Sequence, residues 1–212
     1  MQTIQAYTQI FPDFDGQAIL EKLERIARTC YKSEDKIKEG SAEKMIASLI
    51  KNHHEAMLEH CSLTIKFVVD RGVSHEIVRH RMASFAQESQ RYCNYARDDF
   101  GSEITFIIPH YIKYKSKAWN MWKEQMQAAE KTYFDMLDFG LTPQEARCVL
   151  PNSTKTELVM TANLREWRHF FNLRAAGTTG KPHPQMLEVT VPLLEELKQM
   201  IPVIFDDIEM KG

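Results

Sequence analysis

The sequence predicts a mixed α/β fold, of either the α/β or the α+β type, in which a central sheet is flanked by long helices. Segments with helical spacing of apolar residues are interspersed with short alternating segments, and no regular strand–helix–strand rhythm connects them. The length of 212 residues, with 43% hydrophobic and 26% charged residues, suits one globular domain. Because no internal repeat or linker is visible, we expect a single domain over residues 1–212.

The first third of the chain predicts two helices and a strand. Asp15 and Gly16 form a start signal for one helix, and we expect a second helix with Ser41 as its N-cap. Residues 53–60 are expected to form a polar connection. Apolar and polar residues alternate over residues 61–69, which indicates a half-buried strand.

The middle of the chain contains the longest helical pattern. Ser74 is expected to cap a short helix, and residues 103–108 are strand-like. Helical spacing then extends over residues 115–139, and Gly140 fits the C-terminal stop. The segment that begins at Thr142 has the pattern of a capping box with proline at the first helical position.

The last third predicts a strand, two helices and a loop. Residues 154–161 alternate as a strand, and residues 164–175 return to helical spacing. Residues 177–184 have the composition of a loop. Pro192 is expected to kink or divide the final helix, because proline lacks the backbone donor.

The charge and composition argue against several classes of protein. A formal net charge of −2 is unlike that of nucleic-acid-binding proteins, which usually carry a basic excess. No run approaches the roughly 18 apolar residues of a membrane helix, and we expect no signal peptide at the N-terminus. The four cysteines are widely spaced without a CxxC pair, which predicts reduced thiols and a cytoplasmic location.

Positive charge is nevertheless concentrated in one short segment. Arg79-His80-Arg81, which we call the RHR run, is followed by Ser89 and Arg91. Guanidinium groups offer parallel donors to phosphate or carboxylate, so the segment is typical of a site for a small anion. The polar residues 84–90 are expected to line that ligand as a loop. Taken alone, the RHR run also fits a solvated basic helix face.

A second polar cluster lies downstream, within segments of strong apolar patterning. Arg165, His169 and the neighbourhood of Asn172 are spaced i, i+4 and i+7, and therefore share one helix face. Arg147 and Arg174 lie on either side of this group in the sequence. For His169 alone, a hydrogen-bonded core histidine is the alternative interpretation.

Other common motifs do not fit. His75 to His80 resembles the zinc motif HExxH, but the second histidine falls at i+5, about 140° away from the first around a helix. We therefore expect no metal site. The chain has no G-x-G-x-x-G fingerprint and no P-loop, and Ser89 lacks the G-x-S-x-G elbow of hydrolases.

Together these residues resemble the signature of the flavin-dependent thymidylate synthases. The RHR run followed by Ser89 matches the RHR-x7-S pattern of that family, and Arg91-Tyr92 continues the match. Residues 145–174 are similar to the family's second block, and residues 54–60 (HEAMLEH) resemble its flavin-contacting segment. Three blocks in the right order make the resemblance specific. It implies the thymidylate synthase-complementing protein fold.

The resemblance implies a methyltransferase that converts dUMP to dTMP. The implied carbon donor is 5,10-methylenetetrahydrofolate, with release of tetrahydrofolate, and the implied hydride source is FAD reduced by NADPH. The resemblance further implies a homotetramer with active sites at its subunit interfaces, acting on dUMP and folate as small-molecule substrates.

Two sets of site residues are also implied by the resemblance. Arg174, the implied catalytic residue, favours the N3-deprotonated form of uracil, because an adjacent cation lowers the pKa of an acid. The implied flavin set is His54, Glu59, Arg79, His80, Arg81, Gln87, Asn163, Arg165 and His169. The implied dUMP set is Glu76, Gln87, Ser89, Gln90, Arg91, Arg147 and Arg174.

Some positions depart from the family pattern. Ala56 stands where a hydroxyl residue is common, Glu76 stands where glutamine is common, and the loop over residues 175–181 is longer and glycine-rich. Ser89 is interpreted as a substrate-binding hydroxyl rather than a nucleophile, because the nearby sequence identifies no general base.

Two other functions fit parts of the pattern. One is a reductase that binds FAD and NADPH but lacks methylation. The other is a nucleotide-binding or RNA-binding module that uses the arginines without catalysis.

Overall fold

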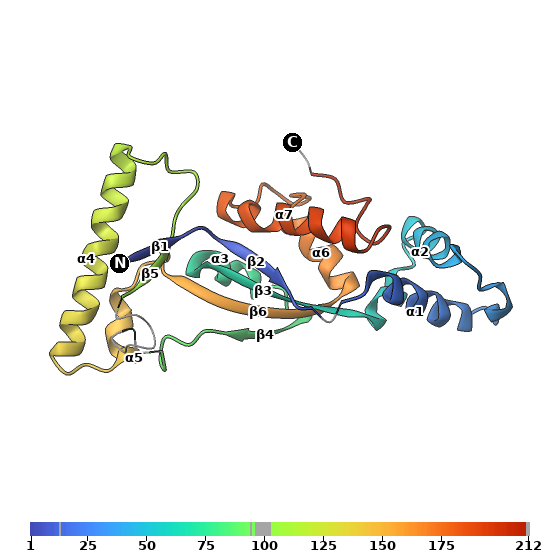
Figure 1. Cartoon of the computed structure of the whole chain (residues 1–212), viewed down its shortest axis with the longest axis horizontal. Helices are drawn as coiled ribbons and strands as arrows, with labels where there is room; N and C mark the ends of the chain where they lie inside the picture. The colour runs from blue at the N-terminus through green and yellow to red at the C-terminus, as the bar shows by residue number, and fades with distance from the viewer. Residues whose placement is uncertain (13, 94, 96–102, 211–212) are drawn as a thin grey trace. The chain divides into compact units, whose positions relative to one another are not determined.

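The computed structural model describes residues 1–12, 14–93, 95 and 103–210 (Figure 1). The chain divides into two compact units. The first unit consists of Met1–Thr8, Lys66–Arg79 and Phe85–Val159. The second unit consists of Gln9–Ile65, His80–Ser84 and Met160–Gly212.

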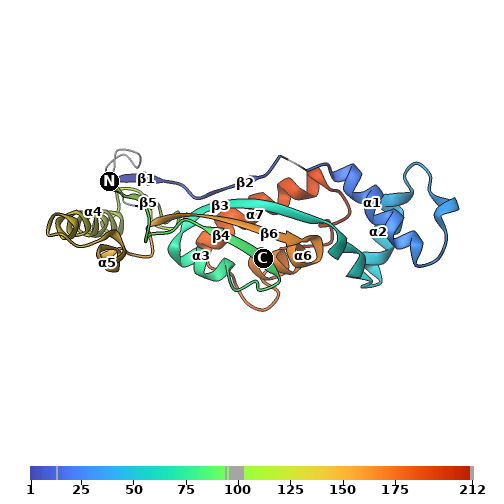
Figure 2. The same cartoon turned by 90° about the horizontal axis from the view of Figure 1, so that it is seen from below.

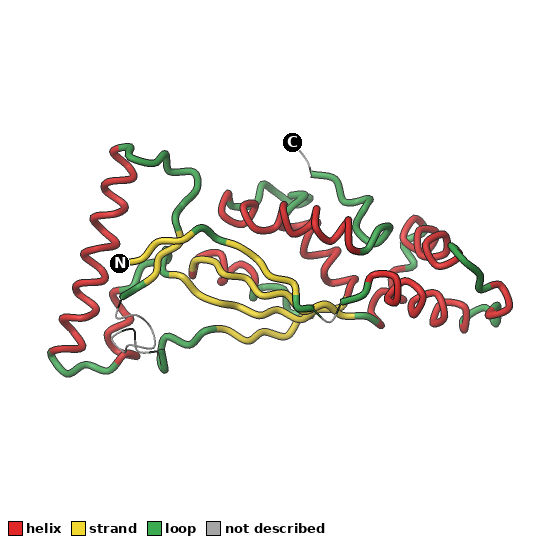
Figure 3. Tube along the Cα trace, in the orientation of Figure 1, coloured by secondary structure: helices red, strands yellow, loops and turns green. Residues whose placement is uncertain are grey.

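A four-stranded sheet with the strand order β2-β3-β6-β4 contributes residues to both units (Figure 3). Its strands are β2 (Tyr7–Ile10), β3 (Ser62–Asp70), β4 (Ala83–Gln87) and β6 (Lys155–Asn163). Every second residue of β6 is buried, as its alternating sequence predicts. The sheet and its helices confirm the mixed α/β class, and the two long strands confirm the predictions for residues 61–69 and 154–161.

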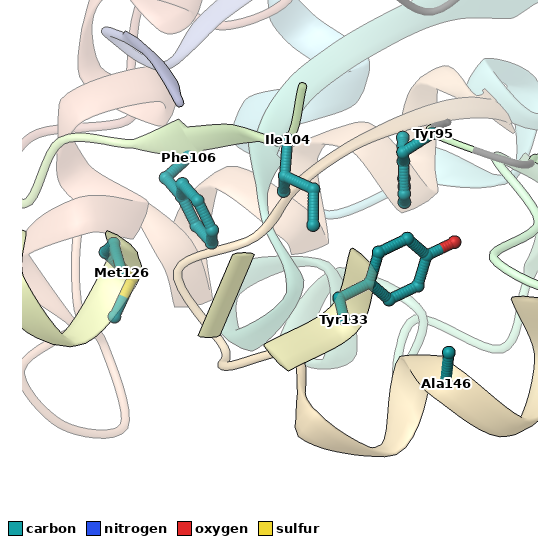
Figure 4. Close-up of a cluster of buried hydrophobic side chains, with 6 residues drawn as sticks. All are labelled: Tyr95, Ile104, Phe106, Met126, Tyr133 and Ala146. Carbon is teal, nitrogen blue, oxygen red and sulfur yellow. The ribbon is translucent and has the colours of Figure 1, made fainter. Parts of the chain in front are cut away.

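The first unit combines a small parallel sheet with a long helix. In that sheet β1 (Gln2–Ile4) pairs with β5 (Thr105–Ile107), which confirms the predicted strand near residue 105. The helices are α3 (Arg71–Ile77), α4 (Lys117–Asp138) and α5 (Pro143–Ala146), followed by the 3-10 turn η4 (Arg147–Val149). Figure 4 shows the core cluster under α4, which consists of Tyr95, Ile104, Phe106, Met126, Tyr133 and Ala146.

The second unit is mostly helical. Its helices are α1 (Gly16–Thr29), α2 (Ser41–Lys51), α6 (Leu164–Arg174) and α7 (Pro184–Met200), with the 3-10 turns η1 (Glu34–Lys36) and η2 (Glu55–His60). Helices α1 and α2 lie side by side in both views (Figures 1 and 2). The aromatic core of α6 is anchored to the sheet by Trp167, whose Nε1 donates to the carbonyl oxygen of Leu63 at 3.2 Å.

Several predicted boundaries are confirmed. Asp15 caps α1, and its carboxylate accepts from the backbone N–H of Ala18 at 3.0 Å. Gly140 follows α4 with φ of 92°, a left-handed conformation that suits glycine. The capping box at Thr142 is present, because the Glu145 carboxylate accepts from the Thr142 N–H at 2.8 Å.

Two predicted caps were wrong. Gly40, at φ of 70°, is the N-cap of α2, and Ser41 instead donates from its hydroxyl to the buried Glu24 at 2.9 Å. Helix α3 begins earlier than predicted, because Asp70 caps it by accepting from the Val73 N–H at 2.8 Å. Ser74 lies inside that helix. At α3 the Asp70 carboxylate supplies the cap, whereas the N-cap of α2 makes no side-chain hydrogen bond to the helix.

Three further expectations differ from the structure. Residues 53–60, expected as a polar connection, include the 3-10 turn η2. Residues 84–90, expected as a loop, begin within β4. Helix α7 is not divided at Pro192, although an internal proline costs about 3 kcal/mol. Buried residues on both sides of it (Val189, Leu193, Leu194, Leu197) outweigh that cost, since each contributes about 1.5–3 kcal/mol.

Two general properties of the chain accompany this fold. All four cysteines are free thiols, in agreement with the predicted reduced state. Among the described residues, none of the helices combines the length and apolar composition needed to cross a lipid bilayer.

The C-terminal segment is held to α6 by a buried guanidinium. Arg168 is only 5% exposed, and its Nη1 and Nη2 donate to both carboxylate oxygens of Asp207 at 2.6 and 2.7 Å. Its Nε donates to Glu55 at 3.2 Å, and Nη1 also donates to the carbonyl oxygen of Ile204. The hydrogen bonds from Arg168 lower the pKa of Asp207.

We predict that Asp207→Asn lowers the free energy of unfolding by about 1 kcal/mol near neutral pH, since the carboxylate is half exposed. The folded-state pKa of Asp207 is depressed, so its contribution is complete above its unfolded pKa of about 3.9 and disappears as the pH falls through the folded value. Urea unfolding at about pH 7 and at successively lower acidic pH should therefore show a difference from the wild type that shrinks as the pH falls below about 4.

Asp135→Asn is the matched control, because its pair with Lys131 lies on the exposed face of α4. This variant should change stability by no more than about 0.5 kcal/mol. Equal losses in the two variants, or a loss in Asp207→Asn that persists at low pH, would contradict the assignment.

Candidate functional site

The second unit contains a site built at the junction of β6 and α6. Asn163 is both the last residue of the strand and the N-cap of the helix, so no loop separates the two elements. Its Oδ1 accepts from the backbone N–H of Glu166 at 2.9 Å. The cap therefore fixes the start of α6, and the first two turns of this helix carry Arg165, Glu166 and His169.

A cavity of about 420 Å³ lies over this junction. Arg165 and Glu59 of η2 both line it, and Nη1 of Arg165 lies 2.5 Å from the carboxylate of Glu59. The pair is half exposed, so the guanidinium keeps access to solvent. The cavity is lined by Glu55, Glu59, Met82, Asn163, Arg165, Glu166, Arg168, His169 and Asn172.

The structure brings part of the predicted flavin set together here. Glu59, Asn163, Arg165 and His169 all line the cavity. His54 also belongs to the second unit, but it lines a separate, mostly apolar cavity of about 290 Å³ between α1, α2 and η2. Arg81 is exposed in the second unit, whereas Arg79 and Gln87 belong to the first.

The RHR run follows the end of α3 and its members differ in burial. Arg79 and Arg81 are exposed, whereas His80 is only 4% exposed. The His80 ring packs edge-to-face on Phe170, with 4.9 Å between ring centroids, and lies 5.7 Å from the ring of His169. Within the second unit, His80 is therefore a buried residue packed against α6 rather than part of an exposed basic surface.

Both ring nitrogens of His80 are engaged. Nδ1 lies 3.1 Å from Oε1 of Glu166, and Nε2 accepts from Nε of Arg174 at 3.2 Å. Burial lowers the pKa of His80, and the Arg174 cation lowers it further despite the hydrogen bond to Glu166. A neutral ring follows, with its proton on Nδ1, since guanidinium can only donate.

His80, Glu166 and His169 also place ligand-type atoms within 4.8 Å of one another. Such a group can in principle hold a cation. Here, however, the proton on Nδ1 of His80 points at Glu166, and Arg174 brings a positive charge to the other face of the ring. This arrangement favours a hydrogen-bonded relay over metal coordination.

The first unit holds most of the predicted dUMP set. Gln87, at the end of β4, donates from Nε2 to Ser74 at 2.9 Å and to Thr156 at 3.2 Å. Two residues on, the Ser89 hydroxyl accepts from the Arg91 N–H at 3.3 Å. Glu76, Ser89, Gln90, Arg91 and Arg147 are also in this unit, whereas Arg174 is in the second.

Arg91 links this segment to the helix that precedes Arg147. Its Nε donates to Oε1 of Gln144 in α5 at 3.4 Å, and its guanidinium lies 5.5 Å from the centroid of the Tyr92 ring. Arg147 begins the next turn and is exposed. Within the first unit, two arginines predicted to bind dUMP therefore lie on connected segments.

Glu88, one of the polar residues 84–90 that were expected to line the ligand, fixes the same segment. It is partly buried, and its carboxylate accepts from Tyr95 at 3.0 Å and pairs with Lys155 at 3.1 Å. Its backbone N–H also donates to the carbonyl oxygen of Glu157 at 2.9 Å. Burial, followed by the negative charge of Glu88, raises the pKa of the Tyr95 hydroxyl.

In the second unit, the residues that the sequence reasoning missed are Glu55, Glu166 and Arg168, and Asn172 was placed only approximately. Helical spacing could have found Glu166, because it stands at i+3 from Asn163 and at i−3 from His169. For Arg168 no local signal existed, since its partner Asp207 lies 39 residues away.

Comparison with known proteins gives a consistent answer. The family model of the thymidylate synthase complementing proteins matches residues 18–203. The chain is 35% identical over 164 residues to the flavin-dependent thymidylate synthase of Pyrococcus furiosus, covering 77% of this chain and 65% of that protein. It is 31% identical over 188 residues to the enzyme of that name from Geobacter sulfurreducens, covering 85% of this chain and 78% of that protein.

The fold agrees with solved structures as well. The structure of a UMP/dUMP methylase, PolB from Streptomyces cacaoi, bound with 5-Br dUMP, superimposes with a TM-score of 0.79 at 22% identity. The match covers 97% of this chain and 96% of PolB. It confirms the predicted thymidylate synthase-complementing protein fold, and the sequence relatives confirm the predicted enzyme class. The chain therefore belongs to the family of the flavin-dependent thymidylate synthases.

Proposed function

We propose that the chain catalyses the reductive methylation of dUMP to dTMP, with 5,10-methylenetetrahydrofolate as carbon donor and NADPH-reduced FAD as hydride source. The observation that carries the proposal is the cavity at the β6–α6 junction. It brings Glu59, from the HEAMLEH segment, against Arg165, from the second motif block, at 2.5 Å. Two sequence blocks separated by 106 residues therefore converge on one cavity in the second unit.

The residues around this cavity fit a flavin nucleotide. The guanidinium of Arg165 is exposed and suits a pyrophosphate, while Asn163 and His169 supply polar groups beside it. The volume of about 420 Å³ lies in the range of small-molecule sites. We assign Arg79, His80, Arg81, His54 and Gln87 to the same cofactor on the family pattern, with His80 acting from beneath the surface.

For dUMP, we propose that Arg91, Arg147 and Ser89 hold the phosphate, because two guanidinium groups and a hydroxyl satisfy its oxygens. Glu76, Gln87 and Gln90 complete the set. The hydrogen bonds from Gln87 to Ser74 and Thr156 hold its amide group in one orientation. An oriented amide is suited to reading the polar edge of a base.

Arg174 is the proposed catalytic residue. Its guanidinium, placed beside the uracil ring, stabilises the N3-deprotonated anion because a neighbouring cation lowers the pKa of an acid. The anionic ring is richer in electrons at C5, where the new carbon attaches. When bound, FAD supplies the hydride, and the protein supplies orientation and electrostatics.

The remaining parts of the proposal concern the assembly and its setting. We propose one synthase domain over residues 1–212, a homotetramer with active sites at its interfaces, and folate as co-substrate, all on the family pattern. The four free thiols support a reducing compartment, and we propose the cytoplasm.

The function is tested by reconstitution. The purified protein with added FAD should show flavin absorption, and with dUMP, methylenetetrahydrofolate and NADPH it should form dTMP. Oxidation of NADPH without dTMP would favour a reductase that lacks methylation. A protein that binds no flavin would exclude both flavoenzymes and leave a nucleotide-binding module.

We predict that Arg174→Ala nearly abolishes dTMP formation while bound FAD is largely retained. The loss should reach about 100-fold or more in kcat/KM, because removal of a group that stabilises developing charge costs about this much. Steady-state kinetics with dUMP, together with the flavin absorption of the variant, checks both statements. Wild-type turnover in Arg174→Ala would refute the assigned role.

Ser89→Ala should retain substantial activity with a raised KM for dUMP. The reason is that the hydroxyl is proposed to bind phosphate rather than to attack a carbon, and one lost hydrogen bond to a charged group weakens binding by about 1.5–3 kcal/mol. Kinetics at saturating dUMP separates the two roles. Complete inactivity with dUMP still bound would instead indicate covalent catalysis by Ser89.

A further inference from the structure

Glu166 and the proposed catalytic arginine, Arg174, both hydrogen-bond the ring of His80. The side chain of Glu166 is only 11% exposed, although a carboxylate on the first turn of a helix ordinarily faces solvent. The backbone of Glu166 is held by the Asn163 cap at 2.9 Å, and its Oε1 lies 3.1 Å from Nδ1 of His80. Glu166 thus reaches His80 from a fixed position on α6.

The ring of His80 connects Glu166 to Arg174. This ring is held from the side by Phe170, at 4.9 Å between centroids, so it cannot swing without losing a buried contact. Its Nε2 accepts from Nε of Arg174 at 3.2 Å. A neutral imidazole can accept at Nε2 only when its proton is on Nδ1, and Glu166 is the acceptor that stabilises that tautomer.

We propose that Glu166 is a positioning residue for Arg174, acting through the tautomer of His80. The carboxylate holds the ring proton on Nδ1, the ring then offers Nε2 as an acceptor, and the Nε edge of the guanidinium is fixed in the plane of that hydrogen bond. The chain of contacts runs entirely through the second unit. Without Glu166, the buried Nδ1–H loses its acceptor and only the hydrogen bond from Arg174 still favours that form, whereas the Nε2–H form presents a donor to the Arg174 guanidinium.

The structure also separates this role from simple support of the fold. The helix N-terminus is stabilised by the backbone N–H of Glu166, which any substitution except proline retains. The Thr190 hydroxyl donates to the carbonyl oxygen of Arg174 at 2.8 Å, so the backbone of Arg174 is held independently. Loss of the Glu166 side chain is therefore expected to change the hydrogen bond between His80 and the Arg174 guanidinium rather than the end of α6.

The first part of the test needs no activity and does not depend on the proposed function. Two-bond proton–nitrogen NMR spectra of the full-length protein, labelled with ¹⁵N at its eight histidines, report which ring nitrogen carries the proton. The His80 signals are assigned by their disappearance in His80→Gln. We expect the Nδ1–H form in the wild type and a shift toward the Nε2–H form or a mixture in Glu166→Leu. A wild-type ring protonated on Nε2 would overturn the proposal.

The second part rests on the proposed function and uses dTMP formation. Glu166→Leu, measured at saturating FAD because Glu166 also lines the proposed flavin cavity, should lower kcat about 10- to 100-fold, since misplacement of a catalytic group by about 1 Å costs this much. Glu166→Gln should recover most of the activity and the Nδ1–H tautomer, because the amide oxygen also accepts. If the Leu variant does not fold, the comparison of Gln with wild type and the wild-type spectrum still decide the question.

Glu195→Leu is the matched control, because this glutamate is half exposed on α7 and pairs with Lys198 at 3.2 Å. It should leave kcat and the His80 spectrum unchanged. An unaltered kcat in Glu166→Leu, alongside an altered tautomer, would show that the tautomer does not position Arg174. If the wild type forms no dTMP while its His80 tautomer is as expected, the proposed function fails and the Glu166–His80 contact stands.

Discussion

The strand-to-helix junction at Asn163 is the constraint on which the second-unit site depends. A strand that runs directly into a helix leaves the amide groups of the first turn without partners, and the Asn163 side chain supplies one. Because the cap fixes the phase of α6, it also fixes which residues face the cavity and which enter the core. Arg165 and His169 face outward, whereas Trp167 and Phe170 are fully buried. A change of phase by one residue would exchange these roles.

Burial divides the charged groups of this helix by function. Arg168 is buried and is compensated by two carboxylates and a carbonyl oxygen, which is the condition under which a buried charge is tolerated. Arg165, one turn earlier, is half exposed and keeps one partner, so it can exchange that partner for a ligand at low cost. The same residue type thus fastens the C-terminal segment in one position and serves the cavity in the other. Only the surroundings distinguish them.

The sequence predicted features that depend on local chemistry and missed those that depend on distant partners. The capping box at Thr142 and the stop at Gly140 were predictable because each is complete within a few residues. The N-cap of α2 was not, because Ser41 is drawn to Glu24 on another helix. The motif blocks identified Arg165, His169 and Glu59, but not Glu166 or Glu88. The contacts of these last two become meaningful only once residues 80 and 155 are brought beside them.

The RHR run shows how far a motif and a mechanism can differ. As a sequence it suggests three equivalent cationic groups, yet the fold makes two of them exposed guanidinium groups and the third a buried, neutral imidazole. A positive charge on His80 would repel Arg174 and would be costly in that buried position. The central histidine therefore serves as an acceptor, and the cation it serves lies 94 residues away in α6. His80 of the first motif block is accordingly connected to Arg174 of the second block by a hydrogen bond. The Glu166 carboxylate determines which ring nitrogen of His80 carries the proton and which accepts that bond.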